Sequence, residues 1–159
     1  MVDMRTNPRL RHLLGAALAI LVLTGVLAVS AGAQEIRIRV LDGRNGSPVP
    51  KEEVQIWLDR KSVSPIVLRL DRDATARIRV NPDVTPALRV QSTSYIDCRP
   101  LRDITVDRTS PSWLPYSLAN VLKSGLVLPN KCGKVTAKAE PGELVLFVRP
   151  WHWWERMWE

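Results

Sequence analysis

The segment Glu35-Ile36-Arg37-Ile38-Arg39-Val40 decides the fold, because its apolar residues alternate strictly with charged ones. Side chains that alternate in this way point to opposite faces of a β-strand, so one face is buried and the other meets solvent. The segment therefore predicts a strand with one face against a hydrophobic core and the other face in solvent. The same period of two recurs at 54–58, 66–70, 76–80, 88–90 and 144–148.

Turn-forming residues separate these segments. Gly, Pro, Asn, Asp and Ser gather at 42–48, 59–65, 71–74 and 81–82, where they favour tight turns. Short alternating strands with turns between them predict an all-β fold, an antiparallel Ig-like sandwich of about seven strands. The chain has 159 residues, which favours one domain, and we place that domain at residues 34–150.

The opening of this domain resembles a known family. The stretches 38–42, 45–50 and 54–58 form a strand, a turn with Gly and Pro, and a second strand, similar to a carboxypeptidase regulatory-like, or transthyretin-like, domain. The family continues with an Asp-x-x-Gly turn, where this chain has Asp71-Arg72-Asp73-Ala74. If the backbone at Ala74 has a positive φ, alanine costs about 1 kcal/mol there.

This resemblance covers roughly residues 35–92. It implies a transthyretin-like sandwich that is not itself catalytic and brings no zinc ligands. The part of the chain from Cys98 onward resembles small exported bacterial proteins.

Residues 1–33 have the three parts of a secretory signal peptide. Arginines between residues 5 and 11 precede an apolar run at 13–30, and Ala31-Gly32-Ala33 has the small residues of a cleavage site. We therefore expect export, to the periplasm or outside the cell. The alternative is an uncleaved membrane anchor, because the apolar run nearly reaches the length that spans a bilayer.

Export favours a disulfide between Cys98 and Cys132, whereas two separate buried thiols are the alternative. The bridge would stabilise the fold by about 3–4 kcal/mol in the chain-entropy model. Between the cysteines, Ser117 is a plausible N-cap and Gly125 a plausible end of a two-turn helix. We expect residues 99–131 to leave the sandwich, carry this helix and be tied back by the disulfide.

Catalytic sites are poorly supported. The only histidine after the signal segment is His152, so a Ser-His-Asp triad would have to use the tail, and a disulfide removes both cysteines as nucleophiles. A catalytic zinc needs three protein ligands, and Asp71 and Asp73 are better explained by a local turn than by calcium. We expect no enzyme, no cofactor and no metal.

Arginines occupy alternating positions that we expect to face solvent. With a net charge of +7, they would form a basic stripe for envelope phosphates or acidic glycans, if their strands share a sheet. Because we expect the protein outside the cytoplasm, we expect no nucleic-acid partner. The alternative is a solvated face whose charge blocks edge pairing. The arginines are Arg37, Arg39, Arg69, Arg77, Arg79 and Arg89.

Tryptophans gather at the C-terminus, residues 151–159. On a helix, Trp151, Trp153, Trp154 and Trp158 share one face, so we expect a short amphipathic helix. It could cap the core, lie in a membrane interface, or dock on a partner or a sugar. Trp57, expected to point outward, would add a second aromatic platform, or would lie under the tail.

These features predict an exported, non-catalytic module that binds an envelope or extracellular protein or surface. The alternatives are a carbohydrate- or peptidoglycan-binding module that uses exposed Trp and Arg, and a peripheral membrane protein docked by its tail.

Overall fold

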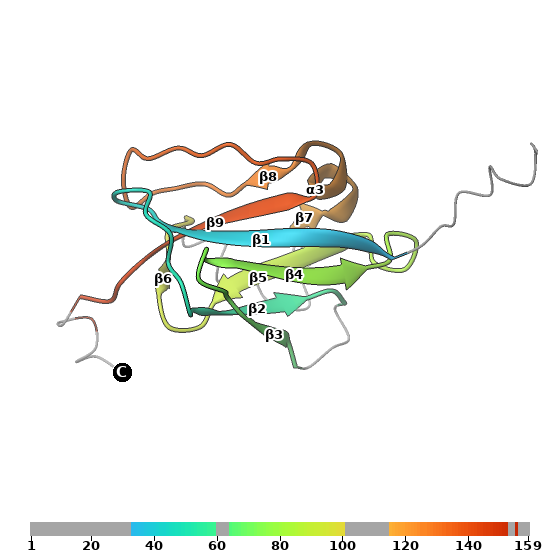
Figure 1. Ribbon diagram of the computed structural model, residues 1–159, viewed down its shortest axis with the longest axis horizontal. Coiled ribbons are helices and arrows are strands. Elements are labelled where there is room, and N and C mark those ends of the chain that lie inside the picture. The colour runs from blue at the N-terminus through green and yellow to red at the C-terminus, as the bar shows by residue number, and fades with distance from the viewer. Residues whose placement is uncertain (1–32, 60–63, 101–114, 153–154, 156–159) are drawn as a thin grey trace, which may run out of the picture. The chain divides into compact units, whose positions relative to one another are not determined.

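Figure 1 shows the computed structural model, which describes residues 33–59, 64–100, 115–152 and 155. The chain divides between Gly32 and Ala33, and the fold below belongs to the part after that division. The described residues are mostly β, with two sheets and one helix. The predicted signal peptide lies outside them.

The first sheet is built around β9 (Glu143–Arg149) and β1 (Gln34–Asp42). β4 (Thr75–Val80) pairs with the other side of β1, while β6 (Ile96–Asp97) and β8 (Leu126–Val127) both pair with β9. The pairs β1–β9 and β8–β9 are parallel. The prediction of a wholly antiparallel fold is therefore wrong, because a period of two reports burial and not strand direction.

The second sheet has the order β3-β2-β5-β7 and is antiparallel throughout. β2 (Glu53–Trp57) lies at its centre beside β5 (Ala87–Ser92), with the short strands β3 (Ile66–Arg69) and β7 (Tyr116–Ser117) at the two edges. The described residues thus hold nine strands, more than the seven expected. The additional strands are two-residue pieces that give no alternating pattern.

Apolar side chains from both sheets form one core. Ile36, Ile38 and Val40 of β1 are fully buried, as their alternation with arginines predicts. The same cluster contains Val54 and Ile56 of β2, Leu88 and Val90 of β5, and Leu144, Leu146 and Val148 of β9. Burial of these side chains is the main stabilising contribution to the fold.

The predicted helix is confirmed as α3 (Leu118–Ser124). The Ser117 side chain caps its first turn by accepting a hydrogen bond from the Asn120 N–H, and Gly125 ends it with a φ of 72°. Leu118 and Val121 are fully buried in the core shared by both sheets.

The prediction that residues 99–131 leave the sheets is wrong for their described part. β7, directly before α3, extends the second sheet, and β8, directly after it, extends the first. Helix α3 therefore connects the two sheets (Figure 1). Its apolar face needs burial, and the core between the sheets supplies it.

The strand β9 is buried on both faces. Val145 and Phe147, on the side away from the main core, are 0% and 1% exposed. They form a second cluster with Leu41 and Cys98, against which residues of the strap, our name for 129–141, are packed. A single solvent-facing side was expected here, so that expectation is wrong for β9.

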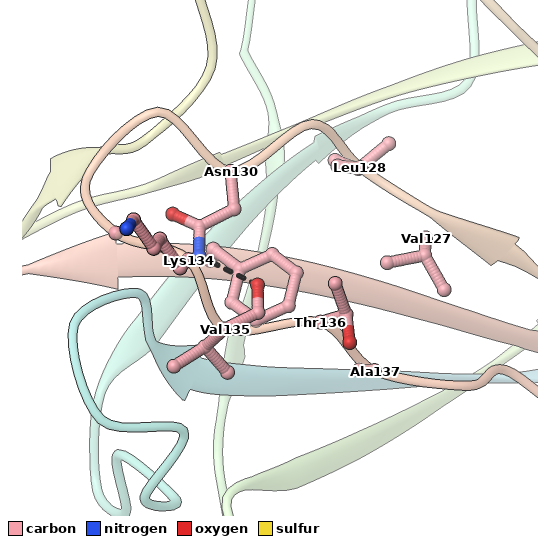
Figure 2. A pocket seen from close by; sticks show the side chains of 9 residues that line it. Val127, Leu128, Asn130, Lys134, Val135, Thr136 and Ala137 are labelled. Atoms are coloured by element: carbon pink, nitrogen blue, oxygen red, sulfur yellow. Dashed lines mark hydrogen bonds between the residues drawn. The ribbon is translucent and has the colours of Figure 1, made fainter.

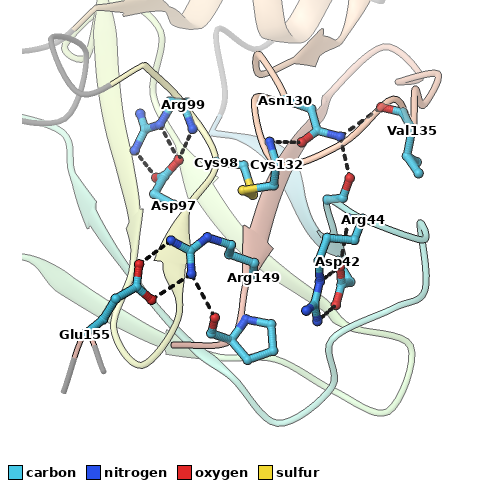
Figure 3. Close-up of a disulfide and its surroundings, with 12 residues drawn as sticks. Asp42, Arg44, Asp97, Cys98, Arg99, Asn130, Cys132, Val135, Arg149 and Glu155 are labelled. Atoms are coloured by element: carbon cyan, nitrogen blue, oxygen red, sulfur yellow. Dashed lines mark hydrogen bonds and ion pairs between the residues drawn. A yellow bond between two sulfur atoms is a disulfide. The ribbon is translucent and has the colours of Figure 1, made fainter. Parts of the chain in front are cut away.

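The predicted disulfide joins Cys98 to Cys132, with 5.3 Å between the Cα atoms (Figure 3). Beside it, Asn130 Nδ2 donates to the carbonyl oxygens of Gly43 (2.8 Å) and Val135 (2.9 Å). A Cβ on Gly43 would lie 2.6 Å from Asn130 Oδ1 and 2.8 Å from the Cys98 sulfur, so only glycine fits. The strap is thus fixed at its base by a covalent bond and by a packed turn.

The disulfide indicates an oxidising, exported compartment. In the described part of the chain, no helix has the length and apolar character needed to cross a membrane.

Candidate functional site at the end of β9

The predicted arginine stripe is assembled in part. β1 and β4 place Arg37 directly opposite Arg77, with Arg39 and Arg79 on the same two strands. Arg69 and Arg89 lie in the second sheet, in β3 and β5. Four of the six arginines therefore share one sheet.

Carboxylates offset most of this charge. Glu143, only 2% exposed, lies 3.1 Å from Arg37 and 3.0 Å from Arg39, measured between guanidinium nitrogen and carboxylate oxygen. Glu35 pairs with Arg77 at 3.1 Å. The surface is thus a network of ion pairs and carries little uncompensated positive charge.

Two predictions about the second sheet are wrong. Arg89 is 2% exposed and Trp57 is 8% exposed, although both were expected to face solvent. They lie opposite each other in the β2–β5 pair, so this face of the sheet is covered at that point. Burial, and then repulsion from Arg99, lowers the pKa of Arg89.

The buried arginine Arg99 was not anticipated from the sequence. Its guanidinium forms an ion pair with Asp97 and donates to the carbonyl oxygen of Val90 (2.7 Å) and to the hydroxyl of Tyr116 (2.8 Å). A buried ion pair of this kind costs desolvation that its hydrogen bonds must offset. The group joins β5, β6 and β7, and its role is structural.

The tail is anchored to the end of β9. Arg149 makes a two-pronged ion pair with Glu155, with nitrogen–oxygen distances of 2.8 Å and 2.5 Å (Figure 3). Glu155 also accepts a hydrogen bond from the His152 N–H (2.8 Å), while its own N–H donates to the His152 carbonyl (3.1 Å). The bond from the His152 N–H to the Glu155 carboxylate corresponds to one half of the capping box that starts a helix, and the other bond closes a single tight turn.

These contacts keep Glu155 ionised. Hydrogen bonds from the Arg149 side chain and then from the His152 N–H lower the pKa of Glu155 to about 2. Trp153, Trp154 and Trp158 lie outside the described residues, so the predicted amphipathic helix stays a prediction beyond this first turn.

Trp151 borders a cavity of about 370 Å³, here called the aromatic cavity. Four structural units contribute to it: the end of β5, the following turn with β6, the end of β9, and the start of the tail. Its walls include two aromatic rings and the anchoring ion pair. The lining residues are Gln91, Ser92, Tyr95, Ile96, Asp97, Arg149, Trp151 and Glu155.

Several polar groups of the aromatic cavity already have partners. The Ser92 hydroxyl donates to Glu52 (2.8 Å) and accepts from the Tyr95 N–H (3.0 Å). Asp97 is held by Arg99, and Arg149 by Glu155.

Three polar side chains of this cavity make no hydrogen bond within the described part of the chain. They are the Gln91 amide, the Tyr95 hydroxyl and the Trp151 indole N–H. The cavity thus combines aromatic surface with uncharged hydrogen-bonding groups, a composition suited to binding.

A second hollow of about 290 Å³ lies between the strap and β9 (Figure 2). Asn130 and Val135 border it, but both groups of the Asn130 amide are used to hold the strap. This hollow belongs to the packing of the strap on Phe147, so of these two hollows in the described part of the chain the aromatic cavity is the better candidate site.

Among the residues described, no group of three or more His, Cys, Asp and Glu side chains could hold a metal ion. Comparisons of the chain with protein-family models, with curated proteins and with solved structures gave no match.

Proposed function

We propose that this chain is an exported, non-catalytic β-sandwich module that binds an envelope or extracellular component through the aromatic cavity. The observation that carries the proposal is the meeting of Tyr95, Trp151 and the unpaired Gln91 amide in one cavity of about 370 Å³. Trp151 is one of the four tail tryptophans expected to bind, whereas Gln91 and Tyr95 carry no sequence signal of their own.

The sandwich architecture is supported by the path of the chain. β1 lies in the first sheet, β2 and β3 form a hairpin in the second, and β4 returns to lie beside β1. Such crossing between two sheets over one core is typical of Greek-key sandwiches. It favours the Ig-like, transthyretin-like resemblance of residues 35–92.

A binding role is also favoured by the chemistry of the reactive side chains. Both cysteines are joined in the disulfide, so neither is a thiolate nucleophile. Arg37, Arg39 and Arg77 of β1 and β4 are paired with carboxylates. This surface therefore supports a charged partner less well than the aromatic cavity supports an uncharged one.

The test is site-specific photocrosslinking of the exported protein in the living cell. A photoreactive amino acid at Ile96, which lines the cavity, is compared with one at Val84, which is 76% exposed. Val84 follows β4 at the opposite end of the sheets, since Val80 pairs with the start of β1 and β9 ends beside the end of β1.

We expect a discrete crosslinked product from position 96 and none from position 84, and we expect Trp151→Ala to abolish it without lowering the melting temperature. Equal crosslinking at both positions, or none at position 96 in folded protein, would overturn the proposal. A crosslink to phospholipid alone would favour the membrane-docking alternative.

A further inference from the structure

Resting on the proposed function, we infer that the aromatic cavity binds an uncharged sugar residue, as a free saccharide or as a unit of a neutral glycan. The inference follows from three features of the cavity: its charge balance, its aromatic surfaces and its unpaired hydrogen-bonding groups.

The charged groups of the aromatic cavity compensate one another. Arg149 is satisfied by both oxygens of Glu155, and Asp97 is satisfied by Arg99, whose side chain is fully buried. An anionic ligand would have to displace Glu155 from Arg149, and a cationic one would find no unpaired carboxylate in the lining. An uncharged ligand leaves both pairs intact, so the cavity favours it.

Two aromatic side chains give the aromatic cavity flat apolar surface. Tyr95 and Trp151 are both half-buried, and each lines the cavity. Rings of this kind combine a large apolar face with a polar edge. A pyranose ring is complementary, because it presents C–H groups on its faces and hydroxyls around its rim.

The polar groups of the aromatic cavity that have no partner among the described residues are complementary to the hydroxyl groups of a ligand. They are less complementary to a single charged group. The Gln91 amide both donates and accepts, the Tyr95 hydroxyl does the same, and the Trp151 indole only donates. Sugar hydroxyls also donate and accept, so each of the three groups finds a partner. A purely apolar ligand would leave them desolvated and unpaired, which costs affinity.

The size of the aromatic cavity limits the ligand. A cavity of about 370 Å³ lies near the lower end of the range of roughly 300–1,000 Å³ typical of small-molecule sites. It therefore holds one or two sugar rings, and a longer glycan would continue outside it.

The experiment titrates the purified, disulfide-bonded protein with defined saccharides, followed by NMR of the Gln91 side-chain amide and the Trp151 indole N–H. The probes are the neutral disaccharides N,N′-diacetylchitobiose and cellobiose, the anionic digalacturonic acid, and an uncharged tetrapeptide. We expect saturable shifts of both signals with at least one neutral disaccharide at concentrations up to about 10 mM, the range of weak, millimolar binding.

Matched variants locate the binding. Gln91→Ala should weaken it about fivefold to tenfold, the effect of losing a ligand hydrogen bond. Gln55→Ala, which alters the residue opposite Gln91 on β2 but outside the cavity lining, should leave it unchanged. Tyr95→Phe separates the hydroxyl from the ring and should cost less than Tyr95→Leu.

Tighter binding of digalacturonic acid or the tetrapeptide than of both neutral disaccharides would overturn the inference. So would an absence of shifts with the neutral disaccharides. If position 96 still crosslinks specifically in the cell in either case, the proposed function stands and only the ligand class fails. If it does not, both fail.

Discussion

Glu52 is a buried carboxylate that closes the end of the second sheet. It is 4% exposed, and its Oε1 accepts hydrogen bonds from the Ser92 hydroxyl (2.8 Å) and from the N–H groups of Thr93 (3.1 Å) and Ser94 (2.7 Å). These residues form the turn that leads to Tyr95, so Glu52 also positions one wall of the aromatic cavity.

Replacing Glu52 by alanine should lower the free energy of unfolding by about 2–3 kcal/mol, because buried donors lose their acceptor. Glu52→Gln keeps an oxygen acceptor and should cost less. Glu53→Ala is the matched control, since Glu53, the next residue and the first of β2, is exposed. Urea unfolding at neutral pH measures all three. Equal losses for residues 52 and 53 would contradict this assignment.

Within the residues that the structure describes, two other than glycine have a left-handed backbone, Lys51 with a φ of 64° and Ala74 with a φ of 57°. The conditional expectation for Ala74 is therefore met, because the position does require a positive φ. Ala74 is fully buried and Lys51 is exposed, so the two positions should respond differently to glycine.

Lys51→Gly should raise the free energy of unfolding by about 1 kcal/mol by relieving the left-handed conformation. At Ala74, glycine gives similar relief but removes a buried methyl worth about 0.8 kcal/mol, so the net change should be close to zero. Thermal and urea unfolding of the two variants check this. A stabilisation at residue 74 as large as that at residue 51 would count against the role of methyl burial.

The end of β9 and the tail turn attached to it connect the first sheet to the aromatic cavity. The tail starts where the sheet ends, and Arg149 holds Glu155 with its two terminal guanidinium nitrogens. Trp151 lies between these two residues in the sequence. The ion pair therefore fixes the wall of the aromatic cavity that the tail supplies.

The attachment should persist across neutral pH and weaken only in strong acid. The pKa of Glu155 is lowered from an ordinary value of 4.5 to about 2, so ionised Glu155 favours the attached tail. This stabilising contribution is fully present above pH 4.5 and is lost as the pH falls towards 2. Titration of the Glu155 carboxyl carbon by NMR should show a midpoint near 2.

Arg149→Met should move that midpoint back towards 4.5, since Arg149 is the main cause of the shift. It should also increase hydrogen exchange at the Glu155 N–H. Arg79→Met, which removes a charge elsewhere on the first sheet, serves as the control. An unchanged midpoint in Arg149→Met would contradict the anchoring role of the ion pair.

At the scale of the whole domain, the disulfide and the strap close the open side of the first sheet. The bridge spans a sequence separation of 34 residues and ties the strap over Val145 and Phe147. The strap buries the side of β9 that would otherwise face solvent, and the disulfide holds the strap at its base.

The double variant Cys98→Ala, Cys132→Ala should lose about 3–4 kcal/mol of unfolding free energy, as expected for a loop of this length. Urea unfolding with and without reductant makes the comparison. Reductant should destabilise the native protein by a similar amount and leave the double variant unaffected. A loss below about 1 kcal/mol would mean that the strap holds without its covalent tie.

The sequence alone determined the local structure of this protein. Strict alternation predicted the buried faces of β1 and β4, and capping residues predicted α3 to within a residue. Two cysteines in a chain expected to be exported predicted the disulfide. Each of these signals is local or compositional, because backbone geometry sets the period of a strand and unpaired N–H groups set the need for a cap.

The tertiary structure decided which faces are covered and which residues meet. Burial of Trp57 and Arg89, the two buried sides of β9 and the parallel β1–β9 pair depend on segments far apart in the chain. The aromatic cavity likewise joins Gln91 and Tyr95 to Trp151, from two segments that are far apart in the chain. The alternation in the sequence indicates which side chains share a face of a strand. What lies against that face is set by tertiary packing.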